Sequence, residues 1–300
     1  MSKYHKFTDH FTYQENRDGI TQYVEIDLEG IKDKLKDKVN CIDTGNKDKK
    51  VFRFEGETRL IYATEVLIPK PKKDRENLLL LLGNPAIHSI KDGMFFSYER
   101  TRGECKWREH RFWDGLRSCG LFTEDPKKPT PDDIAAINTE KKQKLLNGSY
   151  RTCFKFNIFL MTYFSFPTPA SKKKKDAIDY SGVRGIKKAV EDKIFTEMKE
   201  FEFCRFKYIV SSNRIGNIIC FQKEAWSEII NRIGKDNIKC IEGNICNEQN
   251  HPVCQLKLDD ASPVLTLYLA KPTRDIRKNE SKKILKAITC DIENRCNVVS

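Results

Sequence analysis

The sequence lacks any long uninterrupted apolar segment, and its first residues are polar and charged. We therefore expect neither a membrane-spanning helix nor a secretory signal peptide. CxxC spacing is also missing, although the 300-residue chain contains 11 cysteines. Because neither a signal peptide nor a membrane span is expected, we expect an intracellular protein whose thiols are reduced and mostly act as small core residues. The expected location is the cytoplasm, or the nucleus if the protein is eukaryotic.

Metals and cofactors have little support in the sequence. The closest cysteines are Cys240, Cys246 and Cys254, with His251 between the last two. This spacing is wider than in most zinc sites, so we expect no metal, although the sequence alone leaves that option open. No predicted strand is followed by a GxGxxG or GxxxxGK(S/T) motif, which disfavours a nucleotide-binding domain. We expect no cofactor.

The charge of the chain is strongly positive. It contains 55 Lys and Arg residues against 43 Asp and Glu residues, a net charge of +12. Such a surplus favours a polyanionic partner, because cations that neutralise phosphates release condensed counterions. A Lys-rich proteome is the alternative explanation. We expect a monomer that binds DNA and no membrane.

Predicted helices and strands alternate over most of the chain. Five consecutive leucines, Leu78 to Leu82, end at Gly83, and such a run is typical of a strand buried on both faces. Further strands are predicted over 154–166, 206–211 and 263–270, and helices over 107–121, 133–146, 183–199, 223–233 and 280–293. The alternation predicts an α/β fold in three layers, with a mostly parallel central sheet flanked by helices. We expect residues 1–55 to form an N-terminal extension or small lobe, and residues 56–300 to form the main α/β domain.

Three motifs follow one another after the leucine strand. The strand-end loop reads Leu82-Gly83-Asn84-Pro85-Ala86-Ile87-His88-Ser89, then come Gly93-Met94-Phe95-Phe96-Ser97 and Arg111-Phe112-Trp113-Asp114-Gly115-Leu116. Active sites gather at the carboxyl ends of strands in such sheets. The order of the motifs resembles the uracil/thymine DNA glycosylase superfamily, particularly its mismatch-specific branch. The resemblance covers about residues 60 to 295 and implies a uracil-DNA-glycosylase-like fold.

The resemblance implies a monofunctional DNA glycosylase, a hydrolase that cuts the N-glycosidic bond of a flipped base and leaves an abasic site. Cleavage passes through an oxocarbenium-like sugar. The resemblance implies that Asn84 holds the attacking water, since its amide donates and accepts hydrogen bonds but cannot ionise. Gly83 and Pro85 flank it in the base-binding loop. Asp92 is an alternative general base, or else a solvated turn residue.

Several residues are candidates for contact with the base. Phe96 is the candidate for stacking on it, Phe95 competes for that role, and ordinary core packing is the alternative for both. His88 could bond a phosphate or the leaving base, or be a structural histidine. Uracil-selective relatives read the base with an Asn in the middle strand. Here that strand offers no Asn at that place and Thr162 is assigned to base binding instead.

The second loop, Lys271-Pro272-Thr273-Arg274-Asp275-Ile276-Arg277, resembles the His-Pro-Ser or Asn-Pro-Ser loop of the superfamily. The resemblance implies that this loop, including Pro272, binds DNA and that Thr273 grips a phosphate. It also implies that Ile276 is a wedge in the base stack, and that Arg274 or Arg277 fills the resulting hole or holds the backbone. Lys271 would stabilise charge on the leaving base. The alternative is that Lys271 forms a Schiff base with the abasic sugar. Hydrolysis by a water molecule held at Asn84 does not require that intermediate.

Two basic stretches are further candidates for contact with the DNA backbone, Lys70 to Lys73 and Lys172 to Lys175, the latter including Lys173. Solvated loops or import signals are the alternatives for both.

The chain also departs from the superfamily pattern. Leu82 and Ala86 stand where the loop usually has glycine, and a polar insert runs from Tyr98 to His110. The expected substrate is a modified or deaminated pyrimidine. One option is hypermodified cytosine in phage DNA, such as glucosylated hydroxymethylcytosine, which would place the protein in antiviral defence rather than base-excision repair. The alternative function is a non-catalytic DNA-binding or regulatory protein with the same fold.

Overall fold

The computed structural model of the chain describes residues 3–15, 21–27, 32–43, 50–100, 107–124, 130–169, 182–190, 192–240, 252–259 and 262–299. Contacts divide the chain into two compact units that alternate along the sequence. Unit 1 consists of Met1–Leu67, Gly83–Phe95 and Thr162–Tyr208, and unit 2 of Ile68–Leu82, Phe96–Met161 and Ile209–Ser300. Each unit is described by itself.

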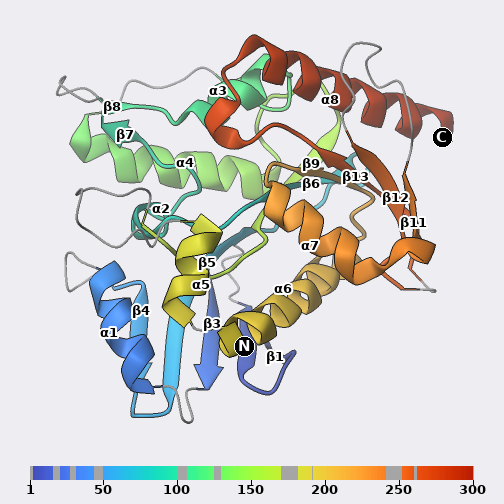
Figure 1. Cartoon of the computed structure of the whole chain (residues 1–300). Coiled ribbons are helices and arrows are strands. Elements are labelled where there is room, and N and C mark those ends of the chain that lie inside the picture. The colour runs from blue at the N-terminus through green and yellow to red at the C-terminus, as the bar shows by residue number, and fades with distance from the viewer. Residues whose placement is uncertain are drawn as a thin grey trace. The chain divides into compact units, whose positions relative to one another are not determined.

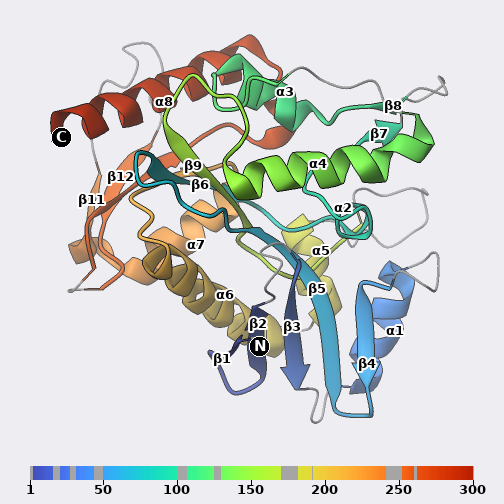
Figure 2. The same ribbon diagram turned by 180° about the vertical axis from the view of Figure 1, so that it is seen from behind.

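Unit 1 contains an antiparallel group of strands. Its members are β1 (Lys3–Lys6), β2 (Phe11–Glu15), β3 (Thr21–Asp27), β4 (Phe52–Glu55) and β5 (Arg59–Leu67). They follow the order β1-β2-β3-β5, and β4 also pairs with β5 (Figure 2). Alternate residues such as Phe11 and Tyr13 in β2, and Val24 and Ile26 in β3, are buried. This period of two places one face of the strands in the core.

The helices of unit 1 are α1 (Lys32–Ile42), the short α2 (Ile87–Lys91), α5 (Gly182–Val190) and most of α6 (Asp192–Ser212). The strand predicted over 206–211 is wrong, because these residues continue α6. Ile194, Met198, Phe201 and Arg205 of this helix are all buried. Their spacing of four, three and four residues is a helical period. The apolar and β-branched residues near position 209 imitate a buried strand only when they are taken without this longer pattern.

Unit 2 contains the buried parallel strands. Its strands follow the order β9 (Phe156–Thr162), β6 (Glu76–Leu82), β10 (Asn217–Cys220), β13 (Leu265–Leu269), β12 (Val253–Leu256) and β11 (Ile238–Cys240). Strand β10 is parallel to both β6 and β13, whereas β12 is antiparallel to β13 and to β11. Every residue of the leucine run 78–82 is buried, as expected for a strand covered on both faces. Strand β10 has no counterpart among the predicted strands.

The helices of unit 2 cover these strands. They are α3 (Arg111–Ser118), α4 (Ile134–Asn147), α7 (Lys223–Ile233) and α8 (Asn279–Val299). Helices α3 and α8 contact each other, and in both views α8 lies on one side of β13 and α7 on the other (Figures 1 and 2). Two short strands, β7 (Glu99–Arg100) and β8 (Trp107–Arg108), precede α3 as an antiparallel pair.

The observed class is mixed α/β, as predicted, but the prediction of a mostly parallel sheet is wrong. Antiparallel pairs predominate, because the strands up to residue 67 pair antiparallel with one another and β12 runs antiparallel to both of its neighbours, β13 and β11. The predicted helices over 133–146 and 223–233 are confirmed by α4 and α7. The helix predicted over 107–121 is shorter, since it begins only at Arg111.

A close approach in unit 2 explains the glycine within α3. A Cβ atom added at Gly115 would lie 2.3 Å from Cδ1 and from Cγ1 of Ile276. Ile276 follows the 3-10 helix η4 (Thr273–Asp275) and is 1% exposed. The isoleucine predicted to be a wedge in the base stack is therefore a core residue that packs on α3, and this burial argues against the wedge role.

We expect Gly115→Ala to destabilise the protein by about 1–3 kcal/mol, because overpacking against Ile276 outweighs the helix propensity of alanine. Urea unfolding measures the change. The matched control is Gly216→Ala, whose added Cβ would have no atom within 4 Å. A double variant with Ile276→Ala should lose less stability than the sum of the two single variants. An equally stable Gly115→Ala protein would contradict this packing.

Candidate functional site

Asn84 lies in the loop that directly follows β6, and its side chain is half-buried. The Asn84 amide nitrogen donates to Thr168 Oγ1 at 2.7 Å and to the Pro85 carbonyl oxygen at 3.2 Å. Among the residues that the structure describes, no donor is bonded to Asn84 Oδ1. The amide is thus fixed through its nitrogen, and its oxygen is available as an acceptor.

Backbone hydrogen bonds hold the Asn84 loop against the segment that follows β9. Phe164 N donates to the Gly83 carbonyl at 2.9 Å, and Thr168 N donates to the Pro85 carbonyl at 3.0 Å. Ile87 N in turn donates to the Thr168 carbonyl at 3.1 Å. These bonds place Asn84 between two residues whose backbone positions are fixed.

Thr168 is a site residue that sequence reasoning missed. It is 2% exposed, and its Oγ1 accepts from both Asn84 Nδ2 and the Gly182 backbone nitrogen, the latter at 3.1 Å. The only signal in the sequence is its place in Pro167-Thr168-Pro169, where a predicted strand stops. A strand-end hydroxyl is a weak signal, because many turns contain one.

The other residues of unit 1 that we predicted to be catalytic or base-binding differ in their exposure to solvent. His88 and Asp92 are exposed, at opposite ends of one turn of α2, and each also interacts within the protein. Pro85 and Phe95 are buried, the latter with 2% exposure. Thr162 is 2% exposed, and its Oγ1 lies 3.4 Å from the Glu65 carbonyl oxygen. The burial of Phe95 and Thr162 argues against the predicted direct contact of these side chains with a base.

Residues before position 55 support the helix that follows the Asn84 loop. Lys91, the last residue of α2, pairs with Asp43 Oδ1 at 2.6 Å. The other carboxylate oxygen of Asp43 accepts from the backbone nitrogens of Val51 and Phe52 at 2.8 and 3.3 Å. Both charged side chains are largely buried, so this bond links the N-terminal region firmly to α2.

In unit 2, Phe96 is held in an uncommon conformation. Its φ is +49°, a backbone state that costs a bulky residue about 1–3 kcal/mol. The half-buried ring stacks on His110 and Phe112, with ring centroids at 4.6 and 4.3 Å. Trp113 Nε1 donates to the Phe96 carbonyl at 3.1 Å. Two ring contacts and one bond to the backbone thus fix Phe96, which is only partly buried.

The second predicted loop presents cations in unit 2. The Arg274 side chain is 82% exposed, and its backbone carbonyl accepts from Arg111 Nη1 at 3.0 Å. Lys271 is partly exposed and pairs with Glu280 at 3.1 Å. Arg277 instead forms a fork with Asp114 Oδ2, with Nε at 3.0 Å and Nη2 at 2.6 Å. Pro272 and Thr273 are half-buried. Arg274, whose Nε lies 3.7 Å from Asp275 Oδ2, is therefore the most exposed cation of this loop.

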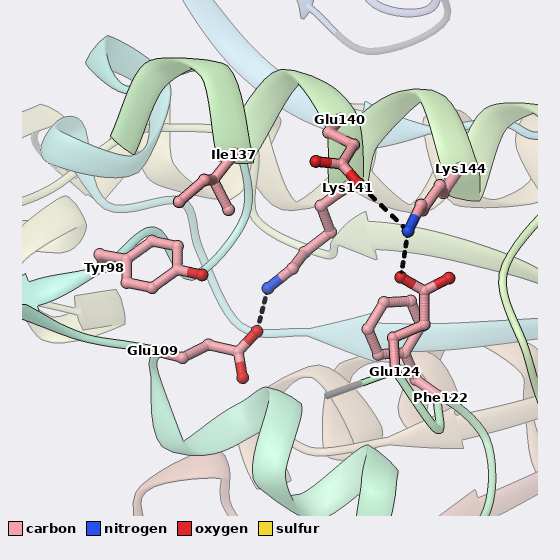
Figure 3. Close-up of a pocket in the computed structure, with 8 residues that line it drawn as sticks. All are labelled: Tyr98, Glu109, Phe122, Glu124, Ile137, Glu140, Lys141 and Lys144. Atoms are coloured by element: carbon pink, nitrogen blue, oxygen red, sulfur yellow. Dashed lines mark hydrogen bonds and ion pairs between the residues drawn. The ribbon is translucent and has the colours of Figure 1, made fainter. Parts of the chain in front are cut away.

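Alternating charges run from Arg277 into the interior of unit 2. Arg117 bonds Asp114 and Glu109, and Glu109 also bonds Lys141 of α4 (Figure 3). The Lys141 ammonium lies 4.4 Å from the centroid of Trp113. Burial lowers the pKa of Lys141, and the neighbouring Glu109 acts in the opposite direction. Each buried charge has a partner of opposite sign, which offsets its desolvation.

A pocket next to Lys141 is too small for a base. Its volume is about 30 Å³, which is room for water only. It is lined by Tyr98, Glu109, Phe122, Glu124, Ile137, Glu140, Lys141 and Lys144 (Figure 3). Several of these residues bond one another, as in the pair Lys144–Glu124 at 2.5 Å. We assign this pocket no role in base binding.

Some predicted residues lie outside the described residues, namely Lys172, Lys173, Cys246 and His251. In the other basic stretch, Lys72 Nζ donates to the Gly148 carbonyl at 2.9 Å. The described part of the chain contains no group of His, Cys, Asp and Glu residues suited to a metal.

No helix among the described residues has both the length and the apolar composition that crossing a membrane requires. No known family model matches the chain, and no curated protein matches it either.

The fork between Arg277 and Asp114 predicts a pH-dependent stability. Although burial acts against it, hydrogen bonds from Arg117 and Arg277 lower the pKa of Asp114 below its ordinary 3.8. The carboxylate thus contributes stability above pH 3.8 that is lost as the pH falls through the folded-state pKa. We expect Asp114→Asn to cost roughly 1 kcal/mol at pH 7. Urea unfolding at several pH values should show the difference from wild type shrinking in acid, and a difference independent of pH would contradict the assignment.

Proposed function

We propose that this protein is a monofunctional DNA glycosylase, which hydrolyses the N-glycosidic bond of a flipped pyrimidine in DNA and leaves an abasic site. The observation that carries the proposal is the amide of Asn84, fixed through its nitrogen with its oxygen available. An order of motifs similar to that of the uracil/thymine DNA glycosylases supports it, as does the parallel group β6, β10 and β13, which fits a three-layer fold of that type. The net charge of +12 fits a DNA partner.

In the proposed mechanism, Asn84 orients water rather than activating it. Its Oδ1 accepts a hydrogen bond from the water and directs a lone pair of the water oxygen toward C1′ of the sugar. Thr168 Oγ1 and the Pro85 carbonyl oxygen prevent the amide from turning over, which would present Nδ2 instead. The base departs with the electron pair of the N-glycosidic bond, the water oxygen bonds to C1′, and a proton is released to solvent. Since Asn84 cannot take that proton, the scheme suits a base that leaves readily.

Two features of unit 2 are assigned to DNA. Phe96 is assigned to stacking on the flipped base, because the residue is only partly buried and its position is fixed by His110 and Phe112. Arg274 binds a backbone phosphate, because it is the most exposed cation of its loop. The protein acts as a monomer in the cytoplasm or nucleus under this proposal.

The substrate is a deaminated or modified pyrimidine. The buried Thr162 leaves the predicted specificity strand without a side chain accessible to the base, so plain uracil is not selected in the way of uracil-selective relatives. Hypermodified cytosine of phage DNA is the option that fits a middle strand without the Asn that uracil-selective relatives use to read the base. Mass spectrometry of bases released from uracil-containing and phage-derived DNA distinguishes the two.

We expect Asn84→Ala to reduce the single-turnover rate of base release by about 100-fold or more, because a misplaced water loses its approach to C1′. DNA binding, measured by fluorescence anisotropy, should be retained. The matched control is Asn147→Ala, since Asn147 is exposed at the end of α4. If the wild-type protein binds DNA but releases no base from any duplex in the panel, the protein is a DNA-binding protein and the glycosylase proposal fails.

We expect Arg274→Ala to weaken DNA binding for all sequences alike and to reduce the slope of log affinity against log salt by about 1, as for loss of one phosphate contact. Arg232→Ala is the control, because Arg232 pairs with Glu228 at 3.0 Å. Equal salt slopes for Arg274→Ala and wild type would show that Arg274 does not bind phosphate.

A further inference from the structure

Helix α6 carries a buried ion pair at the end of β9. Glu202 and Arg205 are both 0% exposed, and Arg205 Nε donates to Glu202 Oε2 at 2.8 Å. Burial raises the pKa of Glu202, with the charge of Arg205 acting in the opposite direction. A buried ion pair adds little stability over apolar residues of similar size, because desolvation of both charges offsets their attraction. The role of this ion pair is therefore better inferred from its contacts with the neighbouring backbone than from its contribution to the stability of the protein.

The pair binds the chain where it leaves β9. Arg205 Nη2 donates to the carbonyl oxygens of Thr162 and Tyr163 at 2.5 and 2.8 Å. Glu202 Oε1 accepts from the backbone nitrogen and from the hydroxyl of Ser165, each at 2.5 Å. Three of the four residues from 162 to 165 are thus bound by two side chains of one helix.

This segment leads directly to the partners of Asn84. The remaining residue of the segment, Phe164, donates from its backbone nitrogen to the Gly83 carbonyl at 2.9 Å. Three residues beyond Ser165, Thr168 accepts from the Asn84 amide at 2.7 Å. A displacement of the segment would therefore move both the backbone before Asn84 and the hydroxyl that orients its amide.

We propose that Glu202 and Arg205 are positioning residues for Asn84. They hold residues 162–165, and through Phe164 and Thr168 they fix the orientation of the Asn84 amide. The consequence for catalysis rests on the glycosylase function proposed above, whereas the consequence for the Asn84 amide itself does not.

Two tyrosines provide a matched pair of variants. Tyr13 of β2 and Tyr62 of β5 both lie directly opposite Val24 of β3, on one face of the strands, and both are 0% exposed. The Tyr62 hydroxyl bonds Ser165 Oγ at 2.9 Å. The Tyr13 hydroxyl has no hydrogen-bond partner among the described residues, and its ring lies 5.9 Å from the Arg205 guanidinium carbon. Only Tyr62→Phe removes a bond to the segment that precedes Thr168.

The first test measures the Asn84 amide itself. We expect its side-chain amide protons, followed by nuclear magnetic resonance, to exchange with solvent several-fold faster in Tyr62→Phe and in Glu202→Gln than in wild type. Tyr13→Phe should exchange at the wild-type rate. If Glu202→Gln does not fold, Ser165→Ala takes its place, because it removes the hydroxyl shared by Glu202 and Tyr62. Unchanged exchange in the folded variants would overturn the proposal, whether or not the protein is a glycosylase.

The second test asks whether the positioning acts through Thr168. In single-turnover base release, Glu202→Gln should lower the rate about 10-fold or more, while DNA affinity and the Tyr13→Phe rate stay near wild type. In a Thr168→Val background the same substitution should have a smaller effect than in wild type, because the hydroxyl that connects the segment to the Asn84 amide is already lost and only the Phe164–Gly83 backbone bond remains. Full additivity of the two substitutions would overturn this route. A wild-type protein that releases no base would refute the glycosylase function alone, since the exchange measurement still decides the positioning.

Discussion

A side-chain amide can hold a water molecule in one orientation only if the amide itself cannot turn. The bond from Asn84 Nδ2 to Thr168 Oγ1 provides that constraint. Thr168 is in turn held by backbone bonds with Pro85 and Ile87. The chain thus uses a hydroxyl that is 84 residues away along the sequence to fix one amide. Further from the site, Asp43 pairs with Lys91 of α2 and so extends the support into the N-terminal region.

Unit 2 contains a series of charged side chains that extends into its interior, where each charge needs a partner to offset its desolvation. Lys141, Glu109, Arg117, Asp114 and Arg277 alternate in sign, so that each charge has a neighbour of opposite sign. Removal of Glu109 would leave the buried Lys141 without its ion-pair partner, which costs more than the pair contributes. Arg277 is bound to Asp114, and the neighbouring Arg274 is the most exposed cation of the loop.

Under the proposed function, chemistry and recognition are carried by residues of different character. Asn84 supplies an uncharged acceptor, and the Phe96 ring is held by stacking in a strained backbone conformation. Neither residue distinguishes one pyrimidine from another by a polar contact. Thr162, the residue of the middle strand assigned to base binding, is buried.

The sequence by itself determined the features that depend on local periodicity and local turns. The leucine run predicted β6, the motif after it placed Asn84 at a strand end, and α4 and α7 followed from their periodic patterns. Only the tertiary structure decided which side chains are accessible and which distant residues meet. Phe95 is buried, whereas its neighbour Phe96 is only partly buried and has a positive φ. The partnership of Thr168 with Asn84 could not be predicted, since hydrogen bonds between segments far apart leave no periodic pattern in the chain.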